Sequence, residues 1–183
     1  MKTLLIVLAM GGAAAAAPGP DFLEAQPPKP VISRDMAASD AVTLIEPTDV
    51  VAFAHDSNLL RADAYDQVDR AAQWLHAHPG YSVVLEGHTD ETGDPAYNAN
   101  LAFARAASVK TRLAQDGIAD DRVVLVAFGE KEAIHPLNVN DRRVVLYATR
   151  LPGRLIASNA LRRGALRATW VYAGSTFDMA PGQ

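Results

Sequence analysis

Short apolar runs alternate with two helical patterns through the middle of the chain, and this alternation is the strongest constraint on its fold. Four runs rich in β-branched residues predict buried strands, at residues 50–54, 82–85, 122–128 and 143–147. Residues 60–78 and 96–116 carry apolar side chains at helical spacing. The order β-α-β-α-β-β contains two crossovers, so we expect an α/β (α+β) domain with a mixed sheet and both helices on one face.

The two predicted helices have defined faces and ends. Apolar stripes lie on one face of each helix: Ala64, Val68, Ala71 and Leu75 on the first, and Ala102, Ala106, Val109 and Leu113 on the second. Pro79-Gly80 stops the first helix, and Gly117 stands where a C-terminal glycine cap belongs after the second. A short strand is also indicated at residues 41–45.

The N-terminal 17 residues are expected to be a secretory signal peptide. Lys2 precedes an apolar stretch, and three alanines end at Ala17, immediately before Pro18. The uncharged stretch is shorter than the roughly 20 apolar residues that usually span a bilayer, and the alternative is an uncleaved anchor. No later stretch predicts a membrane helix.

The remaining chain divides into three parts. Residues 18–44 are expected to be a proline-rich linker, since residues 18–30 contain five prolines, which fix φ and favour extended backbone. Residues 45–150 form the predicted domain, and residues 151–183 form a C-terminal extension. The extension carries four arginines in an apolar stretch, and either a docked helix or a frayed tail fits it.

Composition narrows the location and partners of the protein. The formal net charge is −4, so the chain lacks the overall positive charge that would predict nucleic-acid binding. The absence of cysteine means that an exported chain uses no disulfides, and a lipid on an N-terminal cysteine is not expected. These features favour the periplasm or a secreted location.

A polar segment, LEGHTDETGD at residues 85–94, leaves the end of the second predicted strand. Ligands of open α/β sheets bind at the carboxyl ends of strands, so we expect a binding site there. Asp90 in this segment and Arg105 on the following helix are expected to converge. A carboxylate beside a guanidinium forms either an internal salt bridge or a site for a zwitterion, and charge chemistry alone favours the salt bridge.

The segment GHTDETGDPAYNANLAFARAASVKTRLAQDGI resembles the OmpA-like peptidoglycan-binding domain family. The family pattern G-H-T-D-x-x-G is followed by Y-N-x-x-L-x-x-x-R-A-x-x-V and L-x-x-x-G-I. Further matches are Phe53, Asp56, Ser57 and Leu60 upstream, and Gly129-Glu130 and Arg142-Arg143-Val144 downstream. The resemblance extends over about residues 45–150, so it is far more specific than an isolated short motif.

The resemblance implies a non-enzymatic function without a cofactor or metal. Members of the family bind the peptide stem of peptidoglycan through meso-diaminopimelate, so Asp90 should hold its free ammonium group and Arg105 its carboxylate. This reverses the preference for an internal salt bridge. Asn98, Thr89 and Asp56 are expected secondary contacts, and Arg143 is either structural or faces the ligand. The expected location is the periplasm, with the outer membrane as a further site of association.

The chain departs from the family pattern at residues 129–142. This loop is shorter than the family's, and Asp141 stands where the family has Asn, which puts that side of the site in doubt.

Two other classes of function stay open. A small periplasmic hydrolase would use His88 and Asp90, with or without a metal, but no metal-ligand spacing or acyl-transfer motif accompanies them. His88 is more simply read as a strand residue that makes a structural hydrogen bond. An envelope adaptor would bind another outer-membrane or envelope protein through residues 151–183.

Overall fold

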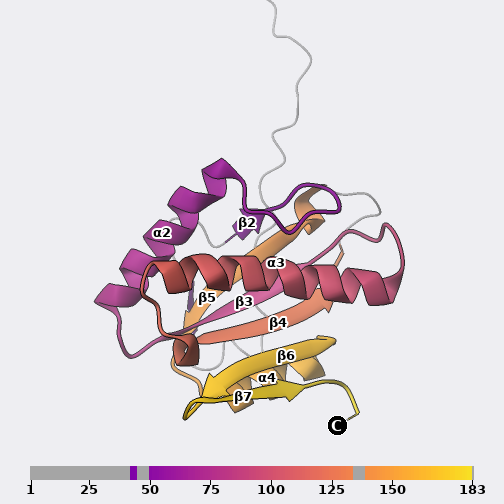
Figure 1. Ribbon diagram of the computed structural model, residues 1–183. Helices are drawn as coiled ribbons and strands as arrows, with labels where there is room; N and C mark the ends of the chain where they lie inside the picture. Colours follow the sequence, from indigo (N-terminus) through magenta and orange to yellow (C-terminus); the bar gives the residue numbers. More distant parts are fainter. Residues whose placement is uncertain (1–41, 45–49, 134–138, 183) are drawn as a thin grey trace, which may run out of the picture.

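One mixed sheet organises residues 42–44, 50–133 and 139–182, the ranges that the computed structural model describes (Figure 1). Its strand order is β1-β5-β3-β4-β6-β7, and β2 also pairs with β5. The strands are β1 (Val42–Leu44), β2 (Val50–Ala52), β3 (Ser82–His88), β4 (Val123–Gly129), β5 (Arg143–Thr149), β6 (Arg167–Tyr172) and β7 (Ser175–Met179). The helices are α2 (Ala62–Ala77), α3 (Pro95–Gln115) and α4 (Gly153–Arg162), with short 3-10 turns η1 (Asp120–Arg122) and η2 (Val139–Asp141).

The predicted order β-α-β-α-β-β is confirmed from β2 to β5. The crossover through α3 makes β3 and β4 a parallel pair, whereas β5 lies antiparallel to β1, β2 and β3. The mixed sheet that the two crossovers predicted is therefore present.

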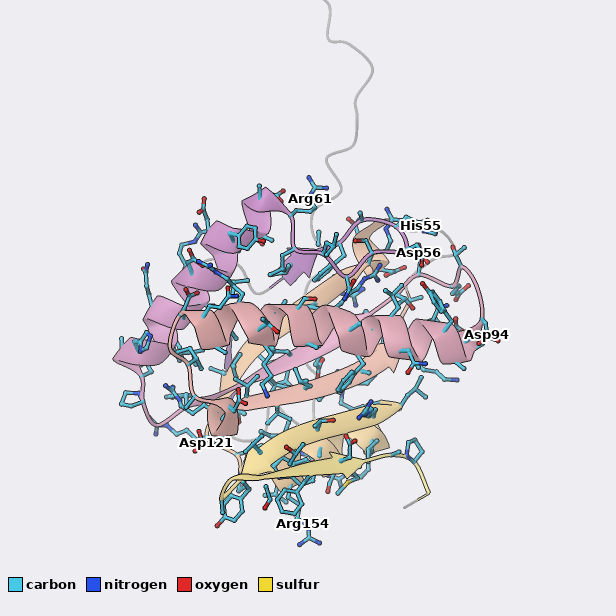
Figure 2. The ribbon with its side chains drawn as sticks, viewed as in Figure 1. His55, Asp56, Arg61, Asp94, Asp121 and Arg154 are labelled. Atoms are coloured by element: carbon cyan, nitrogen blue, oxygen red, sulfur yellow. The ribbon has the colours of Figure 1, made fainter. Side chains whose placement is uncertain are left out.

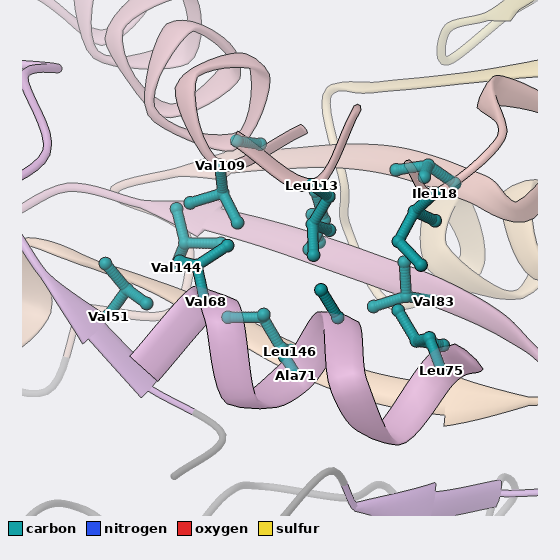
Figure 3. Close-up of a cluster of buried hydrophobic side chains, with 14 of the residues drawn as sticks. Val51, Val68, Ala71, Leu75, Val83, Val109, Leu113, Ile118, Val144 and Leu146 are labelled. Atoms are coloured by element: carbon teal, nitrogen blue, oxygen red, sulfur yellow. The ribbon is translucent and has the colours of Figure 1, made fainter. Parts of the chain in front are cut away.

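Helices α2 and α3 cover one face of the sheet and enclose the larger core (Figure 3). The apolar stripes expected from the sequence supply the helical side of this core, and alternate residues of the strands supply the other side. Buried side chains drawn in Figure 3 include Val51, Val68, Leu75, Val83, Val109, Leu113, Val144 and Leu146.

The expectation that the two helices of the predicted domain share one face is confirmed, and the additional helix α4 covers the opposite face. Ile156, Ala157 and Ala160 of this helix pack with Val84, Val124, Val126 and Phe128 in a second apolar cluster. In β3 and β4, the even-numbered residues 84, 124, 126 and 128 belong to this cluster, whereas the odd-numbered residues 83, 85, 123 and 125 belong to the first. The sheet is consequently covered by helices on both faces.

Residues 151–179 form more than the docked helix or frayed tail expected from the sequence. After α4, Gly164 takes a positive φ of 103°, and the chain turns back as β6, which lies antiparallel to β4. Strand β7 then pairs with β6 and forms an edge of the sheet. The alternation of RATWVY fits a strand once the glycine has ended the helix.

Several sequence expectations concern residues outside the described ranges. The predicted signal peptide at 1–17, the linker as far as residue 41, and residues 134–138 of the shortened loop fall in this category. The end of the predicted linker contributes β1. No helix in the described ranges is long and apolar enough to cross a bilayer.

Candidate ligand-binding site

Most of the predicted site residues gather where β3 and β4 end, at one end of the sheet. The loops after β2 and β3, the N-terminal half of α3 and the residue before β5 meet there, and they bring together Asp56, Asp90, Asn98 and Arg105 with Arg142, which was not among the predicted site residues. Figure 2 shows His55, Asp56 and Asp94 at this end and Asp121 at the other. This group of charged and polar residues thus comes from three separate parts of the sequence, since the loop after β3 leads directly into α3.

Gly87 allows α3 to approach this end of β3. A Cβ atom at position 87 would lie 2.0 Å from the carbonyl oxygen of Ala102 and 2.7 Å from its carbonyl carbon, so only glycine fits without movement of the helix. Arg105 lies three residues beyond Ala102, nearly one helical turn. The close contact therefore sets how far the Arg105 side chain reaches toward the end of the strand.

The N-terminus of α3 is fixed by Asp94. Its carboxylate accepts hydrogen bonds from the backbone N–H groups of Ala96 at 2.9 Å and Tyr97 at 3.1 Å. Pro95 occupies the first helical position, where the missing N–H costs nothing. Asp94 thus has a role in shaping the loop, as has Gly93, which takes a positive φ of 102°.

Arg105 connects the loop after β2 to the end of β3. Its Nε donates to the Ser57 carbonyl at 2.9 Å, Nη1 to that of His88 at 2.8 Å, and Nη2 to that of Ala54 at 3.1 Å. The residue is only 1% exposed. Three of its five N–H donors contact the described residues, and two do not.

The charge of Arg105 survives its burial. Loss of hydration lowers the pKa of Arg105 to about 10, and the negative charge of Asp90 opposes that shift. At neutral pH the guanidinium is therefore protonated and able to hold an anion.

Asp90 carries the opposite charge at the same site. The residue is 4% exposed, and its carboxylate accepts from the backbone N–H of Thr92 at 3.3 Å. Its ion-pair partner is Arg142, with Nη1 3.2 Å from Oδ2, and Nδ1 of His55 lies 4.0 Å away. Within the described ranges no ion pair joins Asp90 to Arg105, so the internal salt bridge of Asp90 forms with a different arginine.

Two of the residues expected as secondary ligand contacts, Asn98 and Asp56, form hydrogen bonds within the protein. Asn98 donates through Nδ2 to Glu130 at 2.7 Å and, more weakly, to the Asp90 carbonyl at 3.4 Å. Tyr97 donates its hydroxyl to Asp56, a bond that raises the pKa of Tyr97. Sequence reasoning did not select Glu130 or Tyr97, although both stand in the matched pattern.

Thr89 and Asp56 are notable for their main-chain geometry as well as for their side chains. The N–H of Thr89 donates to the Gly129 carbonyl at 2.9 Å, which continues the β3–β4 pairing into the loop. The buried Thr89 hydroxyl has no hydrogen-bond partner among the described residues. Asp56 takes a positive φ of 49°, a conformation that aspartate tolerates better than most residues.

Arg143 belongs to a different environment from Arg142. Its Nη1 lies 3.1 Å from Oδ1 of Asp141, and the residue is buried. Successive residues of an extended chain point to opposite faces, so the two arginines face different surroundings. Arg143 lies close enough to His88 for its charge to lower the pKa of that histidine. The residue that meets Asp90 is thus Arg142, which sequence reasoning matched to the family but did not name as a site residue.

His88 lies in a buried polar cluster away from Asp90. Its ring stacks on Phe128 with 5.3 Å between centroids, and burial, followed by the charges of Arg143 and Arg163, holds the pKa of His88 well below its ordinary value. Neither ring nitrogen has a hydrogen-bond partner among the described residues, so the expected structural hydrogen bond of this side chain is not observed there. A histidine so enclosed is poorly placed to act as a base with Asp90.

The same cluster contains the described side chains that come nearest to a metal-binding set. Ligand atoms of Glu86, His88 and Glu132 all lie within 4.8 Å of one another. However, the Arg163 guanidinium contacts Glu86 at 2.7 Å and Glu132 at 3.2 Å, so both carboxylates already face a positive charge. A metal ion would have to compete with that guanidinium for the same oxygens.

Comparison with known protein families identifies the central part of the chain. The OmpA family model matches residues 52–145, which is 94 of the 183 residues. The chain belongs to the OmpA family. The matched range runs from the last residue of β2 to the first part of β5 and includes every residue that surrounds Asp90 and Arg105 above, but it ends before α4, β6 and β7.

Individual OmpA-family relatives resemble part of the chain. The peptidoglycan-associated lipoprotein of Brucella melitensis is 38% identical over 86 residues, 47% of this chain and 51% of that protein. The outer membrane porin F of Pseudomonas fluorescens is 34% identical over 84 residues, 46% of this chain and 26% of the porin. The alignment thus spans about half the length of the lipoprotein relatives.

Solved structures of the OmpA family share the fold. The crystal structure of the peptidoglycan-associated lipoprotein from Burkholderia pseudomallei has a TM-score of 0.53 and 27% identity, and the match covers 56% of this chain and 91% of that one. The C-terminal domain of Helicobacter pylori MotB has a TM-score of 0.52 with 21% identity, covering 64% and 97% of the respective chains.

Proposed function

We propose that this chain binds peptidoglycan non-covalently, through the free end of meso-diaminopimelate in the peptide stem, and so attaches to the cell wall in the bacterial envelope. The observation that carries the proposal is the pair of buried opposite charges, Asp90 and Arg105, at one end of the sheet. A zwitterionic amino-acid end supplies one ammonium and one carboxylate, which complements that pair. The names of the lipoprotein relatives point to the same polymer.

Asp90 is the partner proposed for the ligand ammonium. Its carboxylate is nearly buried, so a charge-assisted hydrogen bond there is stronger than one on the surface. Arg142 already contacts one oxygen, Oδ2, and the Thr92 N–H contacts the other, Oδ1. An ammonium therefore shares the carboxylate with Arg142 or displaces it.

Arg105 is the partner proposed for the ligand carboxylate. The two N–H donors that remain after its three backbone contacts lie on Nη1 and Nη2, one on each. The backbone contacts hold the guanidinium in place before the ligand arrives, which reduces the ordering cost of binding. Asn98 and Thr89, both beside the Asp90 loop, are the proposed secondary contacts.

Binding of a single stem is expected to be modest. A few charge-assisted hydrogen bonds contribute about 1.5–3 kcal/mol each, and the loss of translational and rotational freedom opposes them. Retention on an intact wall then depends on many repeated stems and rapid rebinding.

Co-sedimentation with purified sacculi of the diaminopimelate type tests the proposal. Residues 18–183 should pellet with sacculi and be released by excess free meso-diaminopimelate. Asp90→Asn keeps the shape and removes the charge, so it should lose at least about ten-fold in affinity, equivalent to one charge-assisted bond. Asp121→Asn, at the other end of the molecule, should pellet like the parent (Figure 2).

The same experiment separates binding from turnover. Analysis of the supernatant for released muropeptides detects the hydrolase alternative, and we expect none. If the folded Asp90→Asn variant pellets as strongly as the parent, the proposed contact is wrong.

A further inference from the structure

A groove lies between the start of α4 and the β6–β7 hairpin, outside the part of the chain that matches the OmpA family. Its volume is about 570 Å³, in the usual range for ligand sites. Its lining is formed by Pro152, Gly153 and Arg154 on one side, and by Trp170, Tyr172, Phe177, Asp178 and Met179 on the other. Figure 2 shows Arg154 at this edge of the molecule, beside the hairpin.

The groove is aromatic and open to solvent. Tyr172 is 71% exposed and Phe177 is 42% exposed, which is unusual for side chains of this size. The Trp170 and Phe177 rings stack with 5.5 Å between centroids. Gly153 brings α4 directly against Trp170, since a Cβ at that position would lie 2.6 Å from Cδ1 of the indole. The stacked rings thus form an aromatic surface beside the first turn of α4.

We infer that this groove binds the proline-rich segment of the same chain, residues 18–30, which lies outside the described residues. Aromatic grooves recognise proline-rich peptides because the rings pack against flat pyrrolidine side chains. Prolines also fix φ before binding, so such a segment loses little conformational entropy. The segment PGPDFLEAQPPKP contains five prolines, three of them within its last four residues.

The register of the sheet places the groove within reach of this segment. Val42 pairs with Thr149, and Thr149 pairs with Ser82, the first residue of β3. The residue after Ser82 pairs with the first residue of β4, whose next residue, Val124, pairs with Trp170. Val42 and Trp170 therefore lie in nearly the same row, four strands apart, at a distance of roughly 19 Å.

The connecting chain is long enough to cover that distance. Residues 31–41, which join the segment to Val42, can span up to roughly 36 Å when extended. A tether of this length keeps the segment at an effective concentration of about millimolar near the groove. The segment of the same chain thus has an advantage over a second copy or a foreign peptide.

Charge at the rim fits the same occupant. Arg154 is exposed and has no ion-pair partner among the described residues, and the segment offers Asp21 and Glu24 as partners. Asp178 is already held by Arg167 at 2.6 Å, so the free charge of the rim is positive. An acidic, proline-rich peptide complements an aromatic groove with a positive rim.

Fluorescence of Trp170 tests the inference without any wall ligand. The chain has two tryptophans, so Trp74→Phe in residues 18–183 leaves Trp170 as the only one. Joint replacement of Pro27, Pro28 and Pro30 by serine should raise acrylamide quenching of Trp170 about two-fold, because the segment no longer covers the groove. Pro47→Ser, outside the segment, is the matched control and should leave quenching unchanged.

A peptide added in trans completes the test. A synthetic peptide of residues 18–30 should restore protection in the triple serine variant, saturably, and should fail to do so when Tyr172→Ser is also present. Tyr172 is exposed, so its loss should leave the fold intact, as circular dichroism checks. Equal quenching with and without the prolines overturns the inference, and protection that increases with protein concentration assigns the groove to a second copy instead.

Discussion

The carboxylate of Asp90 lies 3.2 Å from Nη1 of Arg142, although 52 positions separate the two residues in the chain. The pair joins the loop after β3 to the residue before β5, and Asp90 is nearly buried. The Asp90 carboxylate consequently already has a cationic partner. Under the proposed function, a ligand ammonium would compete with Arg142 for that carboxylate.

Removing Arg142 should strengthen ligand binding. In Arg142→Gln the Asp90 carboxylate loses its ion-pair partner, so a ligand ammonium no longer competes with a guanidinium. Because the Arg142 side chain is partly exposed, the gain in binding free energy should be on the order of 0.5–1 kcal/mol, a few-fold in Kd. Calorimetric titration with free meso-diaminopimelate measures this change. Weaker binding by the folded variant would instead show that Arg142 contacts the ligand directly.

Arg105→Lys should weaken both the fold and the site. A lysine ammonium cannot reproduce the three directed contacts of the guanidinium, and we expect the free energy of unfolding to fall by about 2–4 kcal/mol. Urea denaturation measures this loss. Arg112→Lys, on the same helix but paired with Asp69 nearer the surface, is the control and should change stability by less than about 1 kcal/mol. Equal losses in the two variants would contradict a special role for Arg105.

Gly87→Ala should displace α3. The added methyl would overlap the carbonyl group of Ala102, so the helix must move, at a cost of about 1–3 kcal/mol in stability. The same movement withdraws Arg105, so sacculus binding should fall as well. Gly80→Ala, where a Cβ meets nothing within 4 Å, should be nearly neutral in both assays. A neutral Gly87→Ala variant would mean that the contact relaxes without consequence.

The buried His88 should make the fold acid-sensitive. Burial lowers the pKa of His88, so below its ordinary pKa of about 6.5 the unfolded chain takes up a proton that the folded chain does not. Stability contributed by this group is complete above that pH and is lost as the pH falls, by about 1 kcal/mol between pH 7 and 5.5. Chemical denaturation at the two pH values should show this loss in the parent and not in His88→Asn. The same pH slope in both would assign the loss to other groups.

The central fold was predictable because its signals are local. Periodicity at Val68 and Leu75, or at Val109 and Leu113, reports a buried helical face whatever the helix packs against. The β6–β7 hairpin was missed because it consists of strands of five and six residues preceded by Gly164, a pattern that a weak helix also fits. The position of α4 on the second face depends on long-range packing that no local pattern encodes.

The arrangement of the charged residues was predictable in part. The matched motif placed Asp90 and Arg105 at the same end of the sheet, and their contact with a ligand stays a prediction, but of two adjacent arginines the sequence did not indicate which one faces the loop. Arg142 meets Asp90, whereas Arg143 meets Asp141 on the other side of the strand. Because successive residues of an extended backbone point to opposite faces, a shift of one position exchanges the contact with Asp90 for the contact with Asp141.

The direction of the strands has a mechanical consequence. Strand β1 enters beside the end of β5 that precedes α4, whereas Asp90 leaves the opposite end of the sheet. If the chain is held on its N-terminal side and the wall is held at Asp90, tension runs along the strands. The hydrogen bonds between β1 and β5 and between β5 and β3 lie across that direction, so they bear the load together in shear and do not unzip one by one.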